Sequence, residues 1–262
     1  MLNQYFNENC LDTMNRMQDE YVDLVVTSPP YDALRTYDGH VDEFDFNAIS
    51  QELYRVMKPG GVIVWVVADQ VKDDNESGTS FRQALRFKEI GFNLFDTMIY
   101  LKNVRGGLGS VYAYWNEFEY MFVFSKGHPK SINLIKDRKN EYRRASGKGN
   151  RKADGSFGKY RDIKIDEFGR RGNVWGYSQG LYLSTKEKVA FQHPAIFPDK
   201  LAKDHILSWS NEGDIVYDPF SGSGTTLKQA MIHKRNYIGS EVSAEYCDII
   251  KARLHTIDQF FG

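Results

Sequence analysis

The sequence has no apolar run long enough to cross a membrane, and it contains only two cysteines among 262 residues. A transmembrane helix needs about 18 to 20 consecutive apolar residues, and residues 1–9 are polar, unlike a signal peptide. Cys10 and Cys247 are too few for a disulfide framework and lack metal-ligand spacing, which favours a reducing compartment. We therefore expect a cytoplasmic protein with no metal site and no membrane partner.

A large net charge is also lacking, because the whole chain carries only −1. That balance hides one basic segment: Lys136–Arg171 has 13 lysines and arginines against 6 aspartates and glutamates, a net +7 that leaves −8 for the rest. The segment is rich in glycine, poor in aliphatic residues, and interleaved with Tyr142, Phe157, Tyr160 and Phe168. The charge alone is equally typical of a solvated loop, but the aromatic residues favour an inserted surface that contacts a phosphate backbone.

Short apolar runs alternate with segments of helical periodicity along the rest of the chain. The strand candidates are Val22–Thr27, Val62–Val67, Leu94–Leu101, Tyr120–Phe124, Ile215–Asp218 and Asn236–Glu241. Helical spacing covers Phe46–Met57 and Ser80–Ile90, and Met57–Gly61 reads as the turn that ends the first of these helices. This alternation predicts an α/β fold, with a mostly parallel sheet covered by helices on both faces. We expect Leu94–Leu101 and Tyr120–Phe124 to pair antiparallel at one edge.

The strand candidate Val22–Thr27 stops at Ser28-Pro29-Pro30-Tyr31. Two adjacent prolines fix φ and remove two backbone donors, so neither a helix nor a central strand continues through them. Ligands of parallel sheets bind at the carboxyl ends of the strands. A rigid corner that carries a hydroxyl group and an aromatic ring therefore predicts a functional site.

A second corner follows the strand candidate Ile215–Asp218. Phe220-Ser221-Gly222-Ser223-Gly224 turns toward a helix that we expect to start near Thr225, and its glycines allow close approach of a ligand. An ordinary tight turn is the alternative. The next strand, however, ends in Glu241, where a Rossmann-like sheet places its acceptor for ribose hydroxyl groups. The loop lacks the Lys-Ser/Thr pair of a P-loop, and Asp218 at its start suits a zwitterionic or cationic ligand.

Together, Ser28–Tyr31 and Asp218–Thr226 resemble the motif pair of the S-adenosylmethionine-dependent DNA amino-methyltransferases, which methylate adenine N6 or cytosine N4. The catalytic motif precedes the cofactor motif, with the basic segment between them, an order similar to the β subgroup. The resemblance covers most of the chain, including ENCLDTMNRMQDEYVDLVVTSPPY, LYRVMKPGGVIVWV and HPAIFPDKLAKDHI. It implies a Rossmann-like methyltransferase with a catalytic part (residues 1–126), a basic target-recognition insertion (127–190) and a cofactor-binding part (191–262).

The resemblance implies a role for each residue of the first corner. An exocyclic base amine is a poor nucleophile because its lone pair is delocalised into the ring. The Ser28 side chain and the Pro29 carbonyl would accept from the amino hydrogens and localise the lone pair, and the prolines, Pro30 included, would hold these acceptors in place. The base must be flipped out of the duplex to be reached, and Tyr31 would stack on its face.

For the cofactor, the resemblance implies S-adenosylmethionine held by the second corner. Phe220, Gly222 and Gly224 would wrap its methionine part, with Asp218 near the amino group and Glu241 on the ribose hydroxyl groups. The further cofactor-binding residues that the resemblance implies are Asn9, Cys10, Thr225, His193 and Lys200.

The chain departs from the family pattern at two points. Glu8-Asn9-Cys10 stands where the family often has Gly-Asp-Cys, so a contact to the adenine ring must come from Asn9 or be absent. Phe197 stands where the family has a lysine after its His-Pro pair. His193, which lies before a proline, is more typical of a structural hydrogen bonder than of a general base.

The four tryptophans fall into two groups. Trp65 and Trp209 are typical core residues. Trp115 and Trp175 flank or adjoin the insertion and are the better candidates for DNA contact. A metal cluster around His40 is disfavoured because no second histidine lies nearby.

We therefore predict a site-specific methyltransferase that acts on double-stranded DNA. A serine before Pro-Pro-Tyr favours cytosine N4 in this family, and adenine N6 is the alternative. An RNA or small-molecule methyltransferase would keep the glycine loop but would not need both the Pro-Pro-Tyr corner and the basic insertion. A DNA-binding module without enzymatic activity would leave Asp218 and Glu241 without a role. The β-subgroup resemblance also allows a homodimer and a cognate restriction enzyme as partners.

Overall fold

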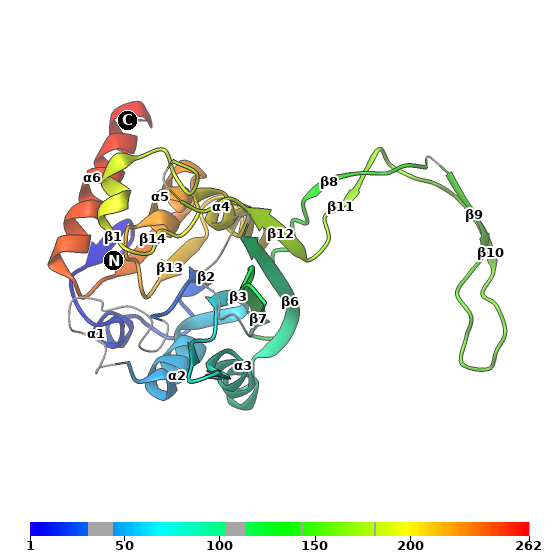
Figure 1. Ribbon diagram of the computed structural model, residues 1–262, viewed down its shortest axis with the longest axis horizontal. Helices are drawn as coiled ribbons and strands as arrows, with labels where there is room; N and C mark the ends of the chain where they lie inside the picture. The colour runs from blue at the N-terminus through cyan, green and yellow to red at the C-terminus, as the bar shows by residue number, and fades with distance from the viewer. Residues whose placement is uncertain (31–43, 103–113, 143, 181, 262) are drawn as a thin grey trace. The chain divides into compact units, whose positions relative to one another are not determined.

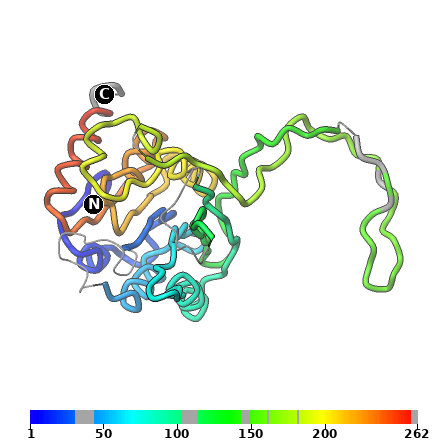
Figure 2. The backbone as a smooth tube through the Cα atoms, viewed as in Figure 1, coloured from blue at the N-terminus to red at the C-terminus, as the bar shows by residue number. Residues whose placement is uncertain are grey.

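The computed structural model describes residues 1–30, 44–102, 114–142, 144–180 and 182–261. The chain divides into two compact units (Figures 1 and 2). The first joins Met1–Asn133 with Asn173–Gly262, and the second is Leu134–Gly172. Tyr31 and the segment around His40 lie outside the described residues, so the predictions made for them stay predictions.

The first unit is built on an eight-stranded sheet with the order β1-β14-β13-β2-β3-β7-β6-β12. Its strands are β1 (Gln4–Phe6), β2 (Val22–Thr27), β3 (Met57–Val67), β6 (Asn93–Lys102), β7 (Phe118–Ser125), β12 (Val174–Tyr177), β13 (Ile215–Asp218) and β14 (Asn236–Ser240). All neighbours pair in parallel except β7, which is antiparallel to both β3 and β6. A separate two-stranded sheet joins β4 (Val71–Lys72) and β5 (Asn75–Glu76).

Helices cover both faces of this sheet, with α1, α2 and α3 packed together on one face and α4, α5 and α6 on the other (Figure 1). Their bounds are α1 (Cys10–Asn15), α2 (Phe46–Val56), α3 (Thr79–Ile90), α4 (Asp199–Trp209), α5 (Thr225–Ile232) and α6 (Ala244–Phe261), with a 3-10 helix η2 (Lys188–Gln192). Local signals set several ends: Asp45 caps α2 by accepting from the Ala48 N–H at 3.1 Å, and Gly91 ends α3 at a φ of 122°.

The predicted and observed bounds agree most closely for the two strands that lead into the corners. β2 and β13 have the predicted bounds, and both are buried along their whole length. The prediction of a turn at Met57–Gly61 was wrong, because α2 ends at Val56 and β3 already starts at Met57. The Gly60 N–H donates to the Lys126 carbonyl at 2.7 Å, so this stretch is held by the chain beyond β7.

The predicted antiparallel pair is present as β6 and β7, but it does not form an edge. β12 pairs in parallel with β6 and becomes the outermost strand. Trp175 on β12 is only 6% exposed and stacks on His205 with ring centroids 4.7 Å apart, so its prediction as a DNA contact was wrong. Trp65 and Trp209 are buried as predicted, whereas Trp115 is 57% exposed.

The second unit is a β-ribbon rather than an irregular loop (Figures 1 and 2). It consists of two antiparallel pairs: β8 (Lys136–Lys139) with β11 (Phe168–Arg170), and β9 (Arg144–Lys148) with β10 (Tyr160–Lys164). None of its described side chains is buried. Tyr142, Phe157 and Tyr160 are among the most exposed aromatic residues of the described chain.

None of the described helices is both long and apolar enough to span a membrane. Within the same residues, no group of three or more His, Cys, Asp and Glu side chains is placed to hold a metal ion.

Candidate active site

A cavity of about 640 Å³ lies at the carboxyl ends of β2, β13 and β14. From β13 the chain crosses through α5 to β14 on one side, and from β2 it crosses through α2 to β3 on the other. Such a reversal of strand order opens a crevice between neighbouring loops, where ligands of α/β sheets bind. The two corners singled out in the sequence therefore face one cavity.

Most of the predicted site residues line this cavity. They are Asn9, Cys10, Ser28, Pro30, His193, Asp218, Phe220, Gly222, Thr225 and Glu241. Pro29, within the proline corner, is buried and does not line the cavity, and Gly224 caps α5 without lining it. Lys200 is exposed on α4 and also lies outside the lining, whereas Phe197, the departure from the family pattern, lies within it.

Asp218 joins the two corners. Its Oδ1 accepts from the Thr27 hydroxyl at 2.6 Å and from the Phe220 N–H at 3.1 Å. Burial raises the pKa of the Asp218 carboxyl to about 6, although these hydrogen bonds act in the opposite direction. An aspartate with this pKa is charged at neutral pH and lacks a cationic partner among the described residues, which suits a ligand with an amino group.

A second bond fixes the same junction from the other side. The Thr226 hydroxyl, in the first turn of α5, donates to the Val26 carbonyl at 3.0 Å. Thr226 and Thr27 are both fully buried. Because β2 ends one residue before Ser28, these contacts fix the proline corner relative to the glycine loop.

Glu241 closes the glycine loop. Its two carboxylate oxygens accept from the Gly222 N–H at 2.7 Å and the Ser243 N–H at 3.0 Å. Gly222 has a φ of 49°, in the left-handed region, and a Cβ there would lie 2.9 Å from His193 Nε2. The loop therefore needs glycine both for its backbone conformation and for its contact with His193.

His193 is packed rather than open to solvent. Its Nδ1 accepts from the Ala195 N–H at 3.1 Å, and its ring meets Tyr246 edge to face with centroids 4.3 Å apart. Only 7% of the residue is exposed. The ring thus forms a fixed wall behind Gly222.

Asn9 and Cys10 form the start of α1 at the cavity wall. Asn9 Oδ1 caps the helix by accepting from the Leu11 N–H at 2.9 Å. An aspartate could cap in the same way, but Asn9 adds an amide donor that an aspartate lacks. Burial raises the pKa of the Cys10 thiol to about 12, so this thiol is not a nucleophile at neutral pH.

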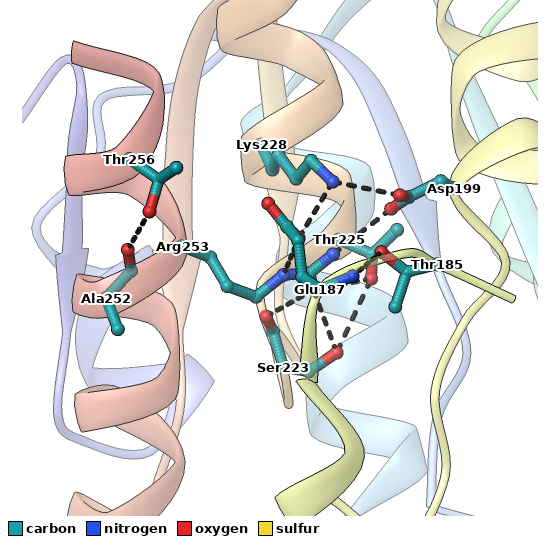
Figure 3. A network of polar contacts seen from close by, with 9 residues as sticks. All are labelled: Thr185, Glu187, Asp199, Ser223, Thr225, Lys228, Ala252, Arg253 and Thr256. Atoms are coloured by element: carbon teal, nitrogen blue, oxygen red, sulfur yellow. Dashed lines mark hydrogen bonds and ion pairs between the residues drawn. The ribbon is translucent and has the colours of Figure 1, made fainter. Parts of the chain in front are cut away.

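A buried ion network supports the loop from behind and was missed in the sequence (Figure 3). Arg253 of α6 is 1% exposed, and its guanidinium donates to the Ser223 carbonyl at 2.6 Å and the Thr225 hydroxyl at 2.9 Å. The same group binds Glu187 at 2.7 Å and Asp199 at 3.1 Å.

Lys228 of α5 completes this network. Its ammonium lies 2.8 Å from both the Glu187 and the Asp199 carboxylates (Figure 3). Two largely buried cations thus balance two carboxylates that stay partly exposed, 25% for Glu187 and 23% for Asp199. Arg253 and Lys228 therefore fix the glycine loop to α4, α6 and the chain before η2.

Comparison with known sequences finds a matching family model and several related proteins. A family model described as DNA methylase, for N6 and N4 methyltransferases, matches residues 22–252. The orphan methyltransferase M.BamHII of Bacillus amyloliquefaciens is 57% identical over 239 residues, covering 89% of this chain and 88% of that protein. The type II methyltransferase M.HpaI of Haemophilus parainfluenzae is 28% identical over 255 residues, covering 94% and 72% respectively.

Solved structures share the fold. The PvuII DNA methyltransferase, described as cytosine-N4-specific, aligns with a TM-score of 0.71 at 21% identity, covering 95% of this chain and 85% of that one. The M1.HpyAVI–SAM complex aligns with a TM-score of 0.62 at 20% identity, covering 96% and 98%. These alignments show the Rossmann-like arrangement predicted from the alternation of strands and helices.

Proposed function

Because this chain belongs to the DNA methylase family of N6-adenine and N4-cytosine methyltransferases, we propose that it methylates cytosine N4 at specific sites in double-stranded DNA. The proposal rests on one observation above all. Thr27, which precedes the proline corner, donates to Asp218, which precedes the glycine loop, at 2.6 Å, and both corners line one cavity. A methyl donor and a target amine bound at these two corners would be neighbours.

The residues present fit S-adenosylmethionine, the cofactor of the family. Asp218 offers a carboxylate to the amino group, Glu241 retains acceptor capacity for ribose hydroxyl groups, and Phe220 offers an apolar surface. When bound, the sulfonium supplies an electrophilic methyl group. The work left to the protein is to orient that group and to exclude water around it.

The proline corner would activate the target amine. The Ser28 hydroxyl and the Pro29 carbonyl accept from its hydrogens and localise its lone pair toward the methyl donor. Pro29 is buried and β2 is fixed by the bonds of Thr27 and Val26, so these acceptors need little reorganisation. Methylation leaves a cationic nitrogen, whose excess proton is then lost to solvent.

We propose cytosine as the target base because a serine, Ser28, stands before Pro-Pro-Tyr and offers a neutral acceptor to the amine. Duplex DNA, RNA of the same sequence and a sample without nucleic acid are each incubated with the protein and methyl-labelled S-adenosylmethionine. Nucleosides are then analysed by mass spectrometry, and we expect label in N4-methylcytosine from duplex DNA. Label only in N6-methyladenine would reject the cytosine assignment, and label only in RNA would reject DNA as the substrate.

We further propose that the second unit is the DNA contact of the target-recognition insertion. Its ribbon carries the +7 excess, and Tyr142, Phe157 and Tyr160 are 57–72% exposed. A two-stranded β-ribbon fits the major groove, where base pairs differ in their hydrogen-bonding pattern. Basic side chains would position the ribbon on phosphates, and the exposed aromatic residues would contact bases or sugars.

Shortening this ribbon should weaken DNA binding and its salt dependence. The Asn140 N–H donates to the Glu167 carbonyl at 2.9 Å, so residues 141–166 can be replaced by an Asn-Gly turn. This removes eight lysines and arginines and four aspartates and glutamates. Because each neutralised phosphate contributes about 0.9 to the slope of log K against log salt, we expect a slope shallower by several units.

The measurement is fluorescence anisotropy on one duplex at several salt concentrations. Lys72→Gln and Lys251→Gln, which remove exposed lysines of the first unit, serve as controls and should keep the slope. A shortened ribbon with the wild-type slope would contradict the assignment of DNA contact to this unit.

Cofactor affinity should depend on the charge of Asp218. The folded pKa of about 6 lies above the ordinary 3.8, so the unliganded protein holds this proton at pH values where an unfolded chain has lost it, and rising pH through this window destabilises the free protein. A bound amino group favours the charged carboxylate. Binding therefore releases a proton below pH 6. In that range Kd should rise about tenfold for each unit by which the pH falls.

Calorimetry with S-adenosylmethionine at pH 5 and pH 7, in buffers of different ionisation enthalpy, measures both effects. Asp218→Asn should bind weakly at both pH values without proton release. Equal affinities of the wild-type protein at the two pH values would show that Asp218 does not face the amino group.

A further inference from the structure

The cavity extends beyond the proline corner toward β6 and β7, where Tyr100, Glu119 and Gln179 line it. Tyr100 and Glu119 are direct partners across the antiparallel β6–β7 pair, so both side chains lie on the same face of the sheet. Gln179 follows two residues after the end of β12, which pairs with β6 at Tyr100 through Trp175. Three strands thus bring polar groups to this end of the cavity.

The Tyr100 hydroxyl is the unusual feature of this region. The residue is 1% exposed, and the hydroxyl oxygen is buried without a hydrogen-bond partner among the described residues. Burial, followed by the Glu119 charge, raises the pKa of Tyr100. The Gln179 side chain, which lies within hydrogen-bonding reach of the hydroxyl without forming a bond of regular geometry, opposes that shift. The hydroxyl therefore remains an O–H donor at neutral pH. A buried donor without a partner is costly, so its retention needs a reason.

The neighbouring carboxylate does not supply that partner. Glu119 forms an ion pair with Lys102 at 3.0 Å, and both side chains are largely buried. The subsite thus presents one O–H donor from Tyr100 and one amide from Gln179, which can donate as well as accept. At the proline corner the cavity presents acceptors. This end combines the Glu119 carboxylate, which is paired with Lys102, with two groups that can donate, the Tyr100 hydroxyl and the Gln179 amide.

This polarity matches one edge of a pyrimidine. In cytosine, the N4 amino group is followed around the ring by two acceptors, N3 and O2. In adenine, the N6 amino group is followed by one acceptor, N1, and then by a C–H group. Two donors beyond the amine-binding corner would both be satisfied by cytosine, but adenine would leave one of them unpaired. Unpaired polar groups in a buried site are a strong source of discrimination.

We propose that Tyr100 and Gln179 form a base-reading subsite that donates to N3 and O2 of the flipped cytosine. The inference rests on the proposed function, since it names the ligand edge recognised at the same site. It explains why the hydroxyl is unpaired in the free protein: its partner arrives with the substrate. Tyr100 is thereby assigned as a specificity-determining residue.

The test is Tyr100→Phe, which removes the hydroxyl and keeps the ring. Because that hydroxyl has no partner in the free protein, we expect the variant to keep its Tm and its Kd for S-adenosylmethionine. Its kcat/KM for duplex DNA should fall about 10- to 100-fold, as expected for loss of a buried hydrogen bond to the substrate. Its preference for cytosine over adenine placed at the target position should fall as well.

Tyr177→Phe is the matched control. Tyr177 is also a buried tyrosine and lies on the adjacent strand, but its hydroxyl donates to Asp204 at 2.7 Å. We expect this variant to lose Tm and to keep kcat/KM. Gln179→Met provides a second test of the subsite at a less buried position and should reduce kcat/KM and cytosine preference in the same direction as Tyr100→Phe.

The outcomes are distinguishable. An active wild-type protein whose Tyr100→Phe and Gln179→Met variants keep kcat/KM and base preference would overturn the subsite and leave the proposed function intact. A Tm loss in Tyr100→Phe equal to that of Tyr177→Phe, with unchanged base preference, would make Tyr100 a structural residue and also overturn the subsite. A wild-type protein that labels no DNA would instead overturn the proposed function.

Discussion

Replacing Gly222 by alanine is expected to weaken binding of S-adenosylmethionine by about 100-fold, because left-handed backbone strain and steric overlap together cost about 3 kcal/mol. The residue has a φ of 49°, and the new Cβ would lie 2.9 Å from His193 Nε2. The imidazole cannot easily move away, because it is bonded to the Ala195 N–H and packed against Tyr246. The loop must move instead, together with its hydrogen bond to Glu241.

Gly213→Ala is the matched control for this change. Gly213 has a φ of 85° and lies before β13, but a Cβ there would meet nothing within 4 Å. Both variants carry the backbone strain, so both should lose a few degrees of Tm, whereas only Gly222→Ala should lose cofactor affinity in calorimetry. Wild-type affinity in Gly222→Ala would show that the cofactor does not bind along this loop.

Replacing Ser28 by alanine should separate binding from chemistry. The loss of one preorganised acceptor at the reacting amine is expected to lower kcat by about 10²- to 10³-fold. Ser28 lines the cavity but is not among the residues that we assign to the cofactor, so the Kd for S-adenosylmethionine should remain that of the wild-type protein. Single-turnover methylation of a duplex measures the first quantity, and calorimetry measures the second.

Ser28→Asp is the companion variant, because it restores an acceptor at the same position. We expect it to recover part of the activity lost in Ser28→Ala. If Ser28→Ala transferred methyl groups at the wild-type rate, the hydroxyl would have no part in activating the amine, and the Pro29 carbonyl would have to act alone.

The bounds of a strand were predicted best where prolines or glycines directly after it end the strand. β2 stops at two prolines and β13 at a glycine loop, and both observed strands have the predicted bounds. β1 and β12 were missed because they have only three and four residues and expose part of their side chains. The position of β12 is set by pairing with β6, which no local pattern in β12 reveals.

The supports of the site were harder to predict than its corners. Arg253, Lys228 and Glu187 come from distant segments, and a charged residue in a single sequence reads as part of a solvated surface. Only the fold shows that Arg253 is buried and donates to the glycine loop, and that Lys228 and Glu187 belong to the same ion network. Tyr100 was hidden in the same way, since it reads as one apolar residue of a strand.

Composition predicted the basic insertion but not its structure. The excess of lysine and arginine marked a segment with few aliphatic residues, and the described side chains of that unit are indeed unburied. Its frequent glycines gave no clear alternation, so the two antiparallel pairs of the ribbon were not foreseen. Target recognition by this unit stays a prediction that the salt-dependence measurement tests.

The most direct test of the account is single-molecule sequencing of an unmethylated duplex library after incubation with the protein and S-adenosylmethionine, because it reports the modified base and its sequence context together. Wild-type protein should place N4-methylcytosine in one fixed context, and Ser28→Ala should leave the library almost unmodified. Modification of adenine alone would contradict cytosine as the target, and an unmodified library from folded, cofactor-binding wild-type protein would contradict methyl transfer to DNA at the junction of the two corners.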